Sequence, residues 1–319
     1  MAGSRGVVVA ALFANGAIAV LKFGGFLLTA SPSMLSETYH SISDTGNQVF
    51  LLIGLRFGGR EADRQHPFGY GKAQFFYSFL VSIFLFGIAG WESLKHGYHV
   101  LTHGGRETGG GVEFLGFTYE PVVGFDLFYV NVAVLLAAIV FESYAFKKAY
   151  AEMRRQIAEN DWGGLREAFR KTSDVTTLTA LTEDTIALLG LIVALLGITL
   201  ARVFDQPLFD AAGALVIGVM LMVFALALAW ENKRLIMGES LPKDEEQELR
   251  RIVEDWEGVE AVVDFRTVYF GPENILLTAD VAFADGIPTG DMDQRITAIE
   301  DAIREANASV DKVYVEPEV

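Results

Sequence analysis

A histidine and an aspartate lie four residues apart in an otherwise apolar part of the chain, within the stretch SETYHSISDTGNQVF. On a helix, His40 and Asp44 would share one face with their Cβ atoms about 5–6 Å apart, so both side chains could reach one cation. A second pair of acids, Glu183 and Asp184, lies in the apolar run LTALTEDTIALLG. These four residues are the candidate ligands of a divalent metal ion.

The ligand types indicate which ions the site would bind. One imidazole combined with carboxylates suits zinc or another first-row divalent ion, whereas a site for a hard ion can be built from oxygen alone. Zinc is the first choice, and manganese, iron(II), cobalt and nickel are compatible with the same ligands. Because such ligands bind a metal when deprotonated, loading the ion releases protons. The residues therefore suggest an exchange of metal for protons.

Other interpretations of these polar residues are open. An HxxxD pair can join two helices by hydrogen bonds without binding an ion, which is our preferred interpretation of the nearby Asn47 and Gln48. Glu183 and Asp184 project about 100° apart on a helix, so they cannot point equally well at one spot. Asp184 is the first choice of ligand. Glu183 is a ligand, a proton carrier or a partner for Lys22.

The composition indicates a membrane protein. The chain has 319 residues, is 51% hydrophobic and has a mean hydropathy of +0.33, which is high for a soluble protein. A helix that crosses about 30 Å of hydrocarbon needs roughly 20 mostly apolar residues. Six segments reach that length: 7–30, 34–56, 74–99, 124–147, 175–202 and 207–231. Charged groups inside such segments are costly, so they should face protein or water and mark an ion pathway.

Basic residues predict the orientation in the membrane. They gather in the loops after the second and fourth predicted spans and at the end of the sixth. Because cytoplasmic loops carry an excess of Lys and Arg, both termini should face the cytoplasm. We expect this to be a prokaryotic cell membrane, with membrane lipid around the predicted spans.

The last part of the chain predicts a separate acidic domain. Residues 239–319 contain 21 acidic and 7 basic side chains and account for most of the net charge of −16. Their pattern predicts helices and strands in the order α-β-β-α-β, hence a small antiparallel α+β domain with its helices on one sheet face. We therefore assign 1–238 to a six-helix transmembrane domain and 239–319 to a cytoplasmic domain. Its acidity argues against a nucleic-acid partner, and the absence of cysteine excludes thiolate metal sites.

Three stretches resemble the cation diffusion facilitator family. SPSMLSETYHSISDTGNQ is similar to the family's second helix, READRQHPFGYGKAQ to its signature loop before the third, and PLFDAAGALVIGVML to its sixth. The resemblance implies six transmembrane helices followed by a cytoplasmic α+β domain of the metallochaperone, ferredoxin-like type. It also implies a homodimeric divalent-metal/proton antiporter that works by alternating access and moves metal out of the cytoplasm.

The resemblance also implies which residues bind the ion. The family takes two ligands from its second helix, which His40 and Asp44 match, and two from its fifth. There Asp184 matches the second position, whereas the first falls on Ala180. The adjacent Glu-Asp pair is similar instead to the branch that includes zinc transporter 9. This leaves Glu183 as the fourth ligand, or a three-residue site completed by water.

A second family site, in the cytoplasmic loop, is matched in part. Asp63 and His66 occupy two of its positions, but a third ligand falls on Tyr70, so a tight HPFGYG turn is the competing interpretation. All five histidines precede residue 104, so the metal site of some family tails cannot form in its usual way. Dimerisation should therefore rest on packing.

Two functions remain to be compared. The first is a proton-coupled transporter, favoured by ionisable groups on two separate predicted spans. The second is a metal sensor or structural membrane protein that binds the ion without moving it. An enzyme would need a substrate-binding loop, and none is evident, so we expect neither an enzyme nor a prosthetic group.

Overall fold

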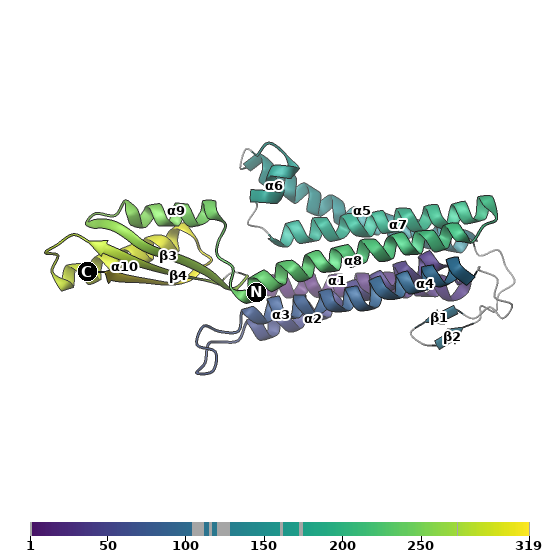
Figure 1. Cartoon of the computed structure of the whole chain (residues 1–319), viewed down its shortest axis with the longest axis horizontal. Coiled ribbons are helices and arrows are strands. Elements are labelled where there is room, and N and C mark those ends of the chain that lie inside the picture. The colour runs from purple at the N-terminus through teal and green to yellow at the C-terminus, as the bar shows by residue number, and fades with distance from the viewer. Residues whose placement is uncertain are drawn as a thin grey trace. The chain divides into compact units, whose positions relative to one another are not determined.

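The computed structural model describes residues 2–103, 112–114, 117–119, 128–159, 162–171, 175–272 and 274–318. Its first part is built from long helices that run side by side (Figure 1). These are α1 (Ala2–Thr29), α2 (Pro32–Gly58), α3 (Lys72–Phe84), α4 (Trp91–His103), α5 (Phe128–Glu159), α7 (Val175–Phe204) and α8 (Leu208–Met237). A π-helical turn, η1 (Leu85–Gly90), joins α3 and α4 into one continuous helix.

Shorter elements accompany these helices. Strands β1 (Val112–Phe114) and β2 (Phe117–Tyr119) form an antiparallel pair, and α6 (Leu165–Lys171) follows α5.

The chain divides into two compact units, which are described separately: Met1–Leu52 with Leu80–Ala229, and Ile53–Phe79 with Trp230–Val319. The domain assignment 1–238 and 239–319 stays a prediction.

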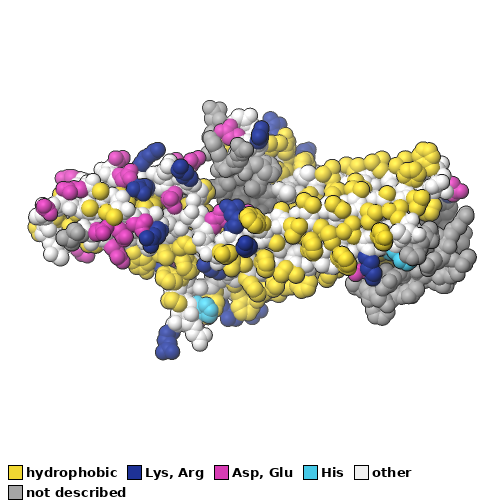
Figure 2. Space-filling model, viewed as in Figure 1, with side chains coloured by type: hydrophobic (Ala, Val, Ile, Leu, Met, Phe, Trp, Pro, Cys, Tyr) yellow, Lys and Arg dark blue, Asp and Glu magenta, His cyan; other side chains and the backbone are white. Residues whose placement is uncertain are grey.

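The helices have the composition of membrane spans. Among the described residues, five stretches are long and apolar enough to cross a membrane: Leu12–Thr29, Lys72–Thr102, Phe128–Glu159, Leu181–Phe204 and Leu208–Met237. Many of their large apolar side chains are exposed, and Figure 2 shows them covering the helices. Charged side chains gather instead on the part of the chain that follows the last long helix, residues 243–318, here called the C-terminal unit. The remaining long helix, α2, is less apolar because it carries the polar stretch of the candidate site.

A short turn sets the start of α2. Ala30 adopts the left-handed conformation (φ 55°), and its N–H donates to Phe26 O at 2.7 Å, which ends α1. The Ser31 hydroxyl accepts a hydrogen bond from the Met34 N–H at 3.2 Å, and Pro32 occupies the first helical position. The sequence TASPS thus ends helix α1 and directly begins helix α2.

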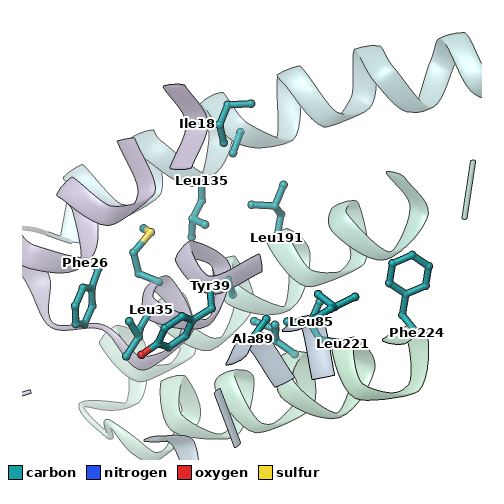
Figure 3. Packing of buried hydrophobic residues seen from close by; sticks show 14 of the residues in the cluster. Ile18, Phe26, Leu35, Tyr39, Leu85, Ala89, Leu135, Leu191, Leu221 and Phe224 are labelled. Atoms are coloured by element: carbon teal, nitrogen blue, oxygen red, sulfur yellow. The ribbon is translucent and has the colours of Figure 1, made fainter. Parts of the chain in front are cut away.

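The first half of α2 lies in the centre of the bundle. Every residue from 31 to 41 is buried. Leu35 and Tyr39 pack in a core with Phe26 of α1, Leu135 of α5 and Leu191 of α7 (Figure 3). This core holds α2 against the helix that carries the second pair of candidate ligands.

The C-terminal unit confirms the predicted order α-β-β-α-β. It consists of α9 (Lys243–Glu254), β3 (Val259–Gly271), β4 (Asn274–Phe283), α10 (Thr289–Ala306) and β5 (Val310–Glu318). Alternate residues of β4, from Ile275 to Val281, are buried with Leu249 of α9 and Ile299 of α10. The helices therefore supply the core on one face of the sheet.

One expectation about this sheet was wrong. The strand order is β3-β4-β5; β3 and β4 are antiparallel, but β4 and β5 are parallel. The reason is the connection between them. Helix α10 carries the chain back along the sheet, so β5 begins beside the start of β4, with Ile275 opposite Val310.

Candidate metal site

The polar residues of α2 fall into two groups. Several hydroxyls bond to the backbone of their own helix: Ser36 Oγ donates to Pro32 O at 3.1 Å, and Thr38 Oγ1 donates to Met34 O at 2.8 Å. Such hydroxyls need no partner on another helix. The second group, Glu37, His40 and Asp44, cannot be satisfied in this way, and the chemistry of α2 therefore rests on these three.

His40 and Asp44 lie one turn apart on α2, as their spacing predicts. His40 Nε2 is 3.6 Å from Asp44 Oδ2, and the two side chains are 2% and 15% exposed. Neither ring nitrogen of His40 has a hydrogen-bond partner among the described residues. Leaving a buried polar group without a partner costs about 1–3 kcal/mol. A residue kept at that cost is a strong candidate for a ligand.

Helix α7 brings the second pair of acids to the same region. Glu183 interacts electrostatically with Asp44 and His40, and Asp44 also interacts with Asp184. Both α7 carboxylates are partly buried. Each of the four predicted ligands therefore interacts electrostatically with at least one of the others. Glu183 interacts with both His40 and Asp44. Within the described residues, however, no three His, Asp or Glu side chains are grouped closely enough to hold a metal ion.

Two acidic residues of this region were not assigned a role from the sequence. Glu142 of α5 interacts electrostatically with His40, Asp44 and Glu183. Glu37 precedes His40 by three residues and is fully buried. A sequence signal existed for both, since an acid inside an apolar span needs a cation or a function.

Glu37 also corrects the sequence interpretation of Lys22. Lys22 Nζ lies 2.8 Å from Glu37 Oε2, and the two side chains are 1% and 0% exposed. The lysine of α1 therefore pairs with Glu37 rather than with Glu183. Because Lys22 is buried, it does not extend its ammonium group to the membrane surface.

Asp63 and His66 lie in the exposed loop between α2 and α3. The Tyr70 hydroxyl donates to Asp63 Oδ2 at 2.7 Å, and the backbone N–H groups of Gln65 and His66 donate to Oδ1 at 2.8 Å. These hydrogen bonds, that of Tyr70 foremost, hold the pKa of Asp63 below its ordinary value. His66 Nδ1 is 3.7 Å from Asp63 Oδ1. Asp63 thus organises the HPFGYG turn, and metal binding there stays a prediction.

The fold and the site together define a class of protein. Apolar helices of membrane-spanning length enclose a histidine and several carboxylates, and a small α+β unit with a charged surface follows them. Ionisable groups in that position are typical of ion pathways, so the class is that of membrane proteins with a candidate cation site between their helices.

Comparison with known proteins specifies this class further. The family model described as Cation efflux transmembrane domain matches residues 8–237, and the one described as Cation efflux protein, cytoplasmic domain, matches residues 241–318. The chain belongs to the cation efflux, or cation diffusion facilitator, family. The resemblance noted in the sequence is thereby confirmed, and this is a family of transporters rather than enzymes.

Curated relatives come from animals, plants and bacteria. The chain is 27% identical over 305 residues to the "Proton-coupled zinc antiporter SLC30A9, mitochondrial" of Homo sapiens, covering 94% of this chain and 50% of that protein. It is 25% identical over 288 residues to "Metal tolerance protein C4" of Arabidopsis thaliana, covering 88% and 57%. It is 25% identical over 273 residues to the "Cation-efflux pump FieF" of Cronobacter sakazakii, covering 86% and 79%. The chain spans about half the length of the first two relatives.

Proposed function

We propose that this protein exchanges a divalent metal cation, preferably zinc, for protons across a membrane. His40 and Asp44 of α2, with Glu183 and Asp184 of α7, would hold the ion. The observation that supports this best is the buried imidazole of His40, which lies beside Asp44 and has no hydrogen-bond partner among the described residues. An imidazole and carboxylates together are zinc ligands, and a metal ion would give a ring nitrogen of His40 a partner.

Proton coupling follows from the chemistry of the ligands. Each ligand binds the metal in its deprotonated form, so an ion that enters displaces protons and an ion that leaves allows their return. The ligands come from two helices, so a shift of α7 against α2 would assemble or separate them. Alternating access would then link each movement of metal to an opposite movement of protons.

The remaining features of the proposal concern orientation and assembly. The basic loops favour both termini in the cytoplasm, with metal leaving that compartment. The match of residues 241–318 to a cytoplasmic domain of cation efflux proteins supports this orientation, and that domain would join two chains as a homodimer. The bacterial relative supports a prokaryotic cell membrane, although another relative is described as mitochondrial.

The test is uptake of zinc and manganese into proteoliposomes with an imposed pH gradient. We expect the wild-type chain to move zinc only with the gradient, and Asp44→Ala and Asp184→Ala to abolish uptake. Glu260→Ala removes an exposed carboxylate of the C-terminal unit and is the matched control, with uptake unchanged.

Three results would count against the proposal. Uptake that is indifferent to the gradient would exclude proton coupling. Uptake that survives both aspartate substitutions would separate transport from this site. A wild-type chain that binds zinc or manganese but moves neither ion would favour a metal sensor or structural protein instead.

A further inference from the structure

The ion pair between Lys22 and Glu37 has no part in the function proposed above. Both groups are almost completely buried and their charged atoms are 2.8 Å apart. Withdrawing two charges from water costs free energy that their attraction often fails to recover, and apolar replacements are frequently neutral or stabilising. Stability alone is therefore a weak reason for such a pair, and its position suggests a different role.

Glu37 lies next to the candidate metal ligands along α2. It precedes His40 by three residues, so the two side chains lie on neighbouring parts of one helix face. Electrostatic interactions with Glu37 and Lys22 reach both His40 and Asp44. The charges of Lys22 and Glu37 therefore contribute to the electrostatic potential at both candidate ligands of α2.

The second oxygen of Glu37 points toward α7. Oε1 has no hydrogen-bond partner among the described residues, and a Cβ added to Gly190 would lie 2.6 Å from it. Gly190 follows Glu183 by seven residues, which is about two helical turns and therefore the same face of α7. Glu37 consequently carries a buried carboxylate oxygen that has no partner among the described residues and faces α7, about 10 Å along that helix from Glu183.

We infer that Lys22 withholds Glu37 from the metal ion and thereby makes the site select zinc over manganese. This inference rests on the proposed function, because it concerns the same site. Zinc prefers four ligands that include nitrogen, whereas manganese prefers more ligands, mostly oxygen. An additional carboxylate at Glu37 would raise the number of oxygen ligands and the negative charge of the site. The ammonium group of Lys22 holds Oε2 of this carboxylate and balances its negative charge, which opposes that change.

Other charges around Glu37 support this direction of effect. The acids that interact with its neighbours His40 and Asp44 are Glu142 from α5 and Glu183 and Asp184 from α7. Among the main charges that act on His40 and Asp44, Lys22 supplies the basic group. Lys22 is therefore the cation that limits the negative charge offered to a metal.

The experiment measures zinc and manganese affinities of the full-length chain in nanodiscs by isothermal titration calorimetry with the metal chlorides. Lys22→Met removes the ammonium group, and Lys22→Gln removes its charge but keeps a hydrogen-bond donor for Glu37. In both we expect the zinc-to-manganese affinity ratio to fall about tenfold, the usual scale for groups that support a metal ligand. Lys22→Met combined with Glu37→Gln should restore the wild-type ratio, because no carboxylate is then released.

Two controls separate charge from packing. Glu37→Gln alone leaves the ammonium group unpaired, and it should weaken both metals without changing their ratio. Thr29→Val removes a hydrogen bond from Thr29 Oγ1 to Asn131 Oδ1 between α1 and α5 without altering charge, and it should leave the ratio as in wild type.

Several results would overturn the inference. One is an unchanged ratio in folded Lys22→Met or Lys22→Gln; another is the same shift in the double variant, which would exclude Glu37 as its cause. If both neutral lysine variants fail to fold while the double variant folds, the pair serves folding rather than selectivity. Because this experiment measures binding, a lower ratio in the Lys22 variants together with no metal uptake by the wild-type chain would refute the transport proposal alone.

Discussion

Nε2 of His40 and Oδ2 of Asp44 are 3.6 Å apart on successive turns of α2. This distance is short enough for both atoms to bind one metal ion but too long for a hydrogen bond between them. The imidazole is the one nitrogen donor among the predicted ligands of the membrane site, and nitrogen favours zinc over harder ions. The preference between metals should therefore depend on His40.

We predict that His40→Asp converts the site to oxygen ligands and lowers the preference for zinc over manganese about tenfold. The measurement is the ratio of initial uptake rates of the two metals into proteoliposomes. His66→Asp makes the same replacement in the exposed loop that holds the second candidate site, and an unchanged ratio in this variant would assign the selectivity to the membrane site. A shift produced by His66→Asp instead would move the selective site to that loop.

The candidate residues of this site could be selected from the sequence because polar side chains are rare in membrane-spanning segments. His40, Asp44, Glu183 and Asp184 interrupt apolar runs, and each lies on a helix where its segment predicted one. The partner of Lys22 could not be predicted, since it depends on how α1 and α2 pack and both Glu37 and Glu183 were candidates by charge. The direction of β5 was also missed. An alternating pattern predicts a strand and its buried face but not its direction beside its neighbour.

Asp210 fixes the start of α2 against α8, and its removal should destabilise the bundle. Its Oδ1 accepts a hydrogen bond from the Ser33 N–H at 3.0 Å, and its backbone O accepts one from the Ser33 hydroxyl at 2.8 Å. We predict that Asp210→Ala, which leaves a buried N–H unpaired, costs about 1–3 kcal/mol. Thermal unfolding in detergent should show a lower Tm. Asp210→Asn retains an acceptor oxygen and should lose much less, and equal losses in both variants would argue against the hydrogen bond.

Helices α4 and α8 approach closely at glycines. A Cβ added to Gly97 would lie 2.9 Å from Ala211 O, which is backbone and cannot move aside cheaply. We predict that Gly97→Ala separates the two helices and costs about 1–3 kcal/mol, as overpacking usually does. The control is Gly24→Ala in α1, since an added Cβ at Gly24 meets nothing within 4 Å. A Tm that falls as far for Gly24→Ala would show that the loss comes from the helix itself rather than from the contact.

The turn between α2 and α3 should depend on pH through Asp63. Its pKa is lowered, chiefly by the hydrogen bond from the Tyr70 hydroxyl, so the folded turn gains stability that is fully present above the ordinary pKa of an aspartate. That gain is lost as the pH falls through the lowered value. Tyr70→Phe removes the main cause, and the turn should then loosen at a higher pH than in wild type.

Hydrogen exchange of residues 60–71 between pH 2 and pH 5, corrected for intrinsic exchange rates, measures this difference. We expect protection to be lost at a higher pH in Tyr70→Phe, and to change little with pH in Asp63→Asn, which has no carboxyl group to titrate. Identical pH midpoints in wild type and Tyr70→Phe would show that the tyrosine hydroxyl does not control Asp63. The same substitution frees Asp63 Oδ2, so stronger zinc binding by Tyr70→Phe than by wild type would indicate that the tyrosine keeps this aspartate for the turn and away from a metal.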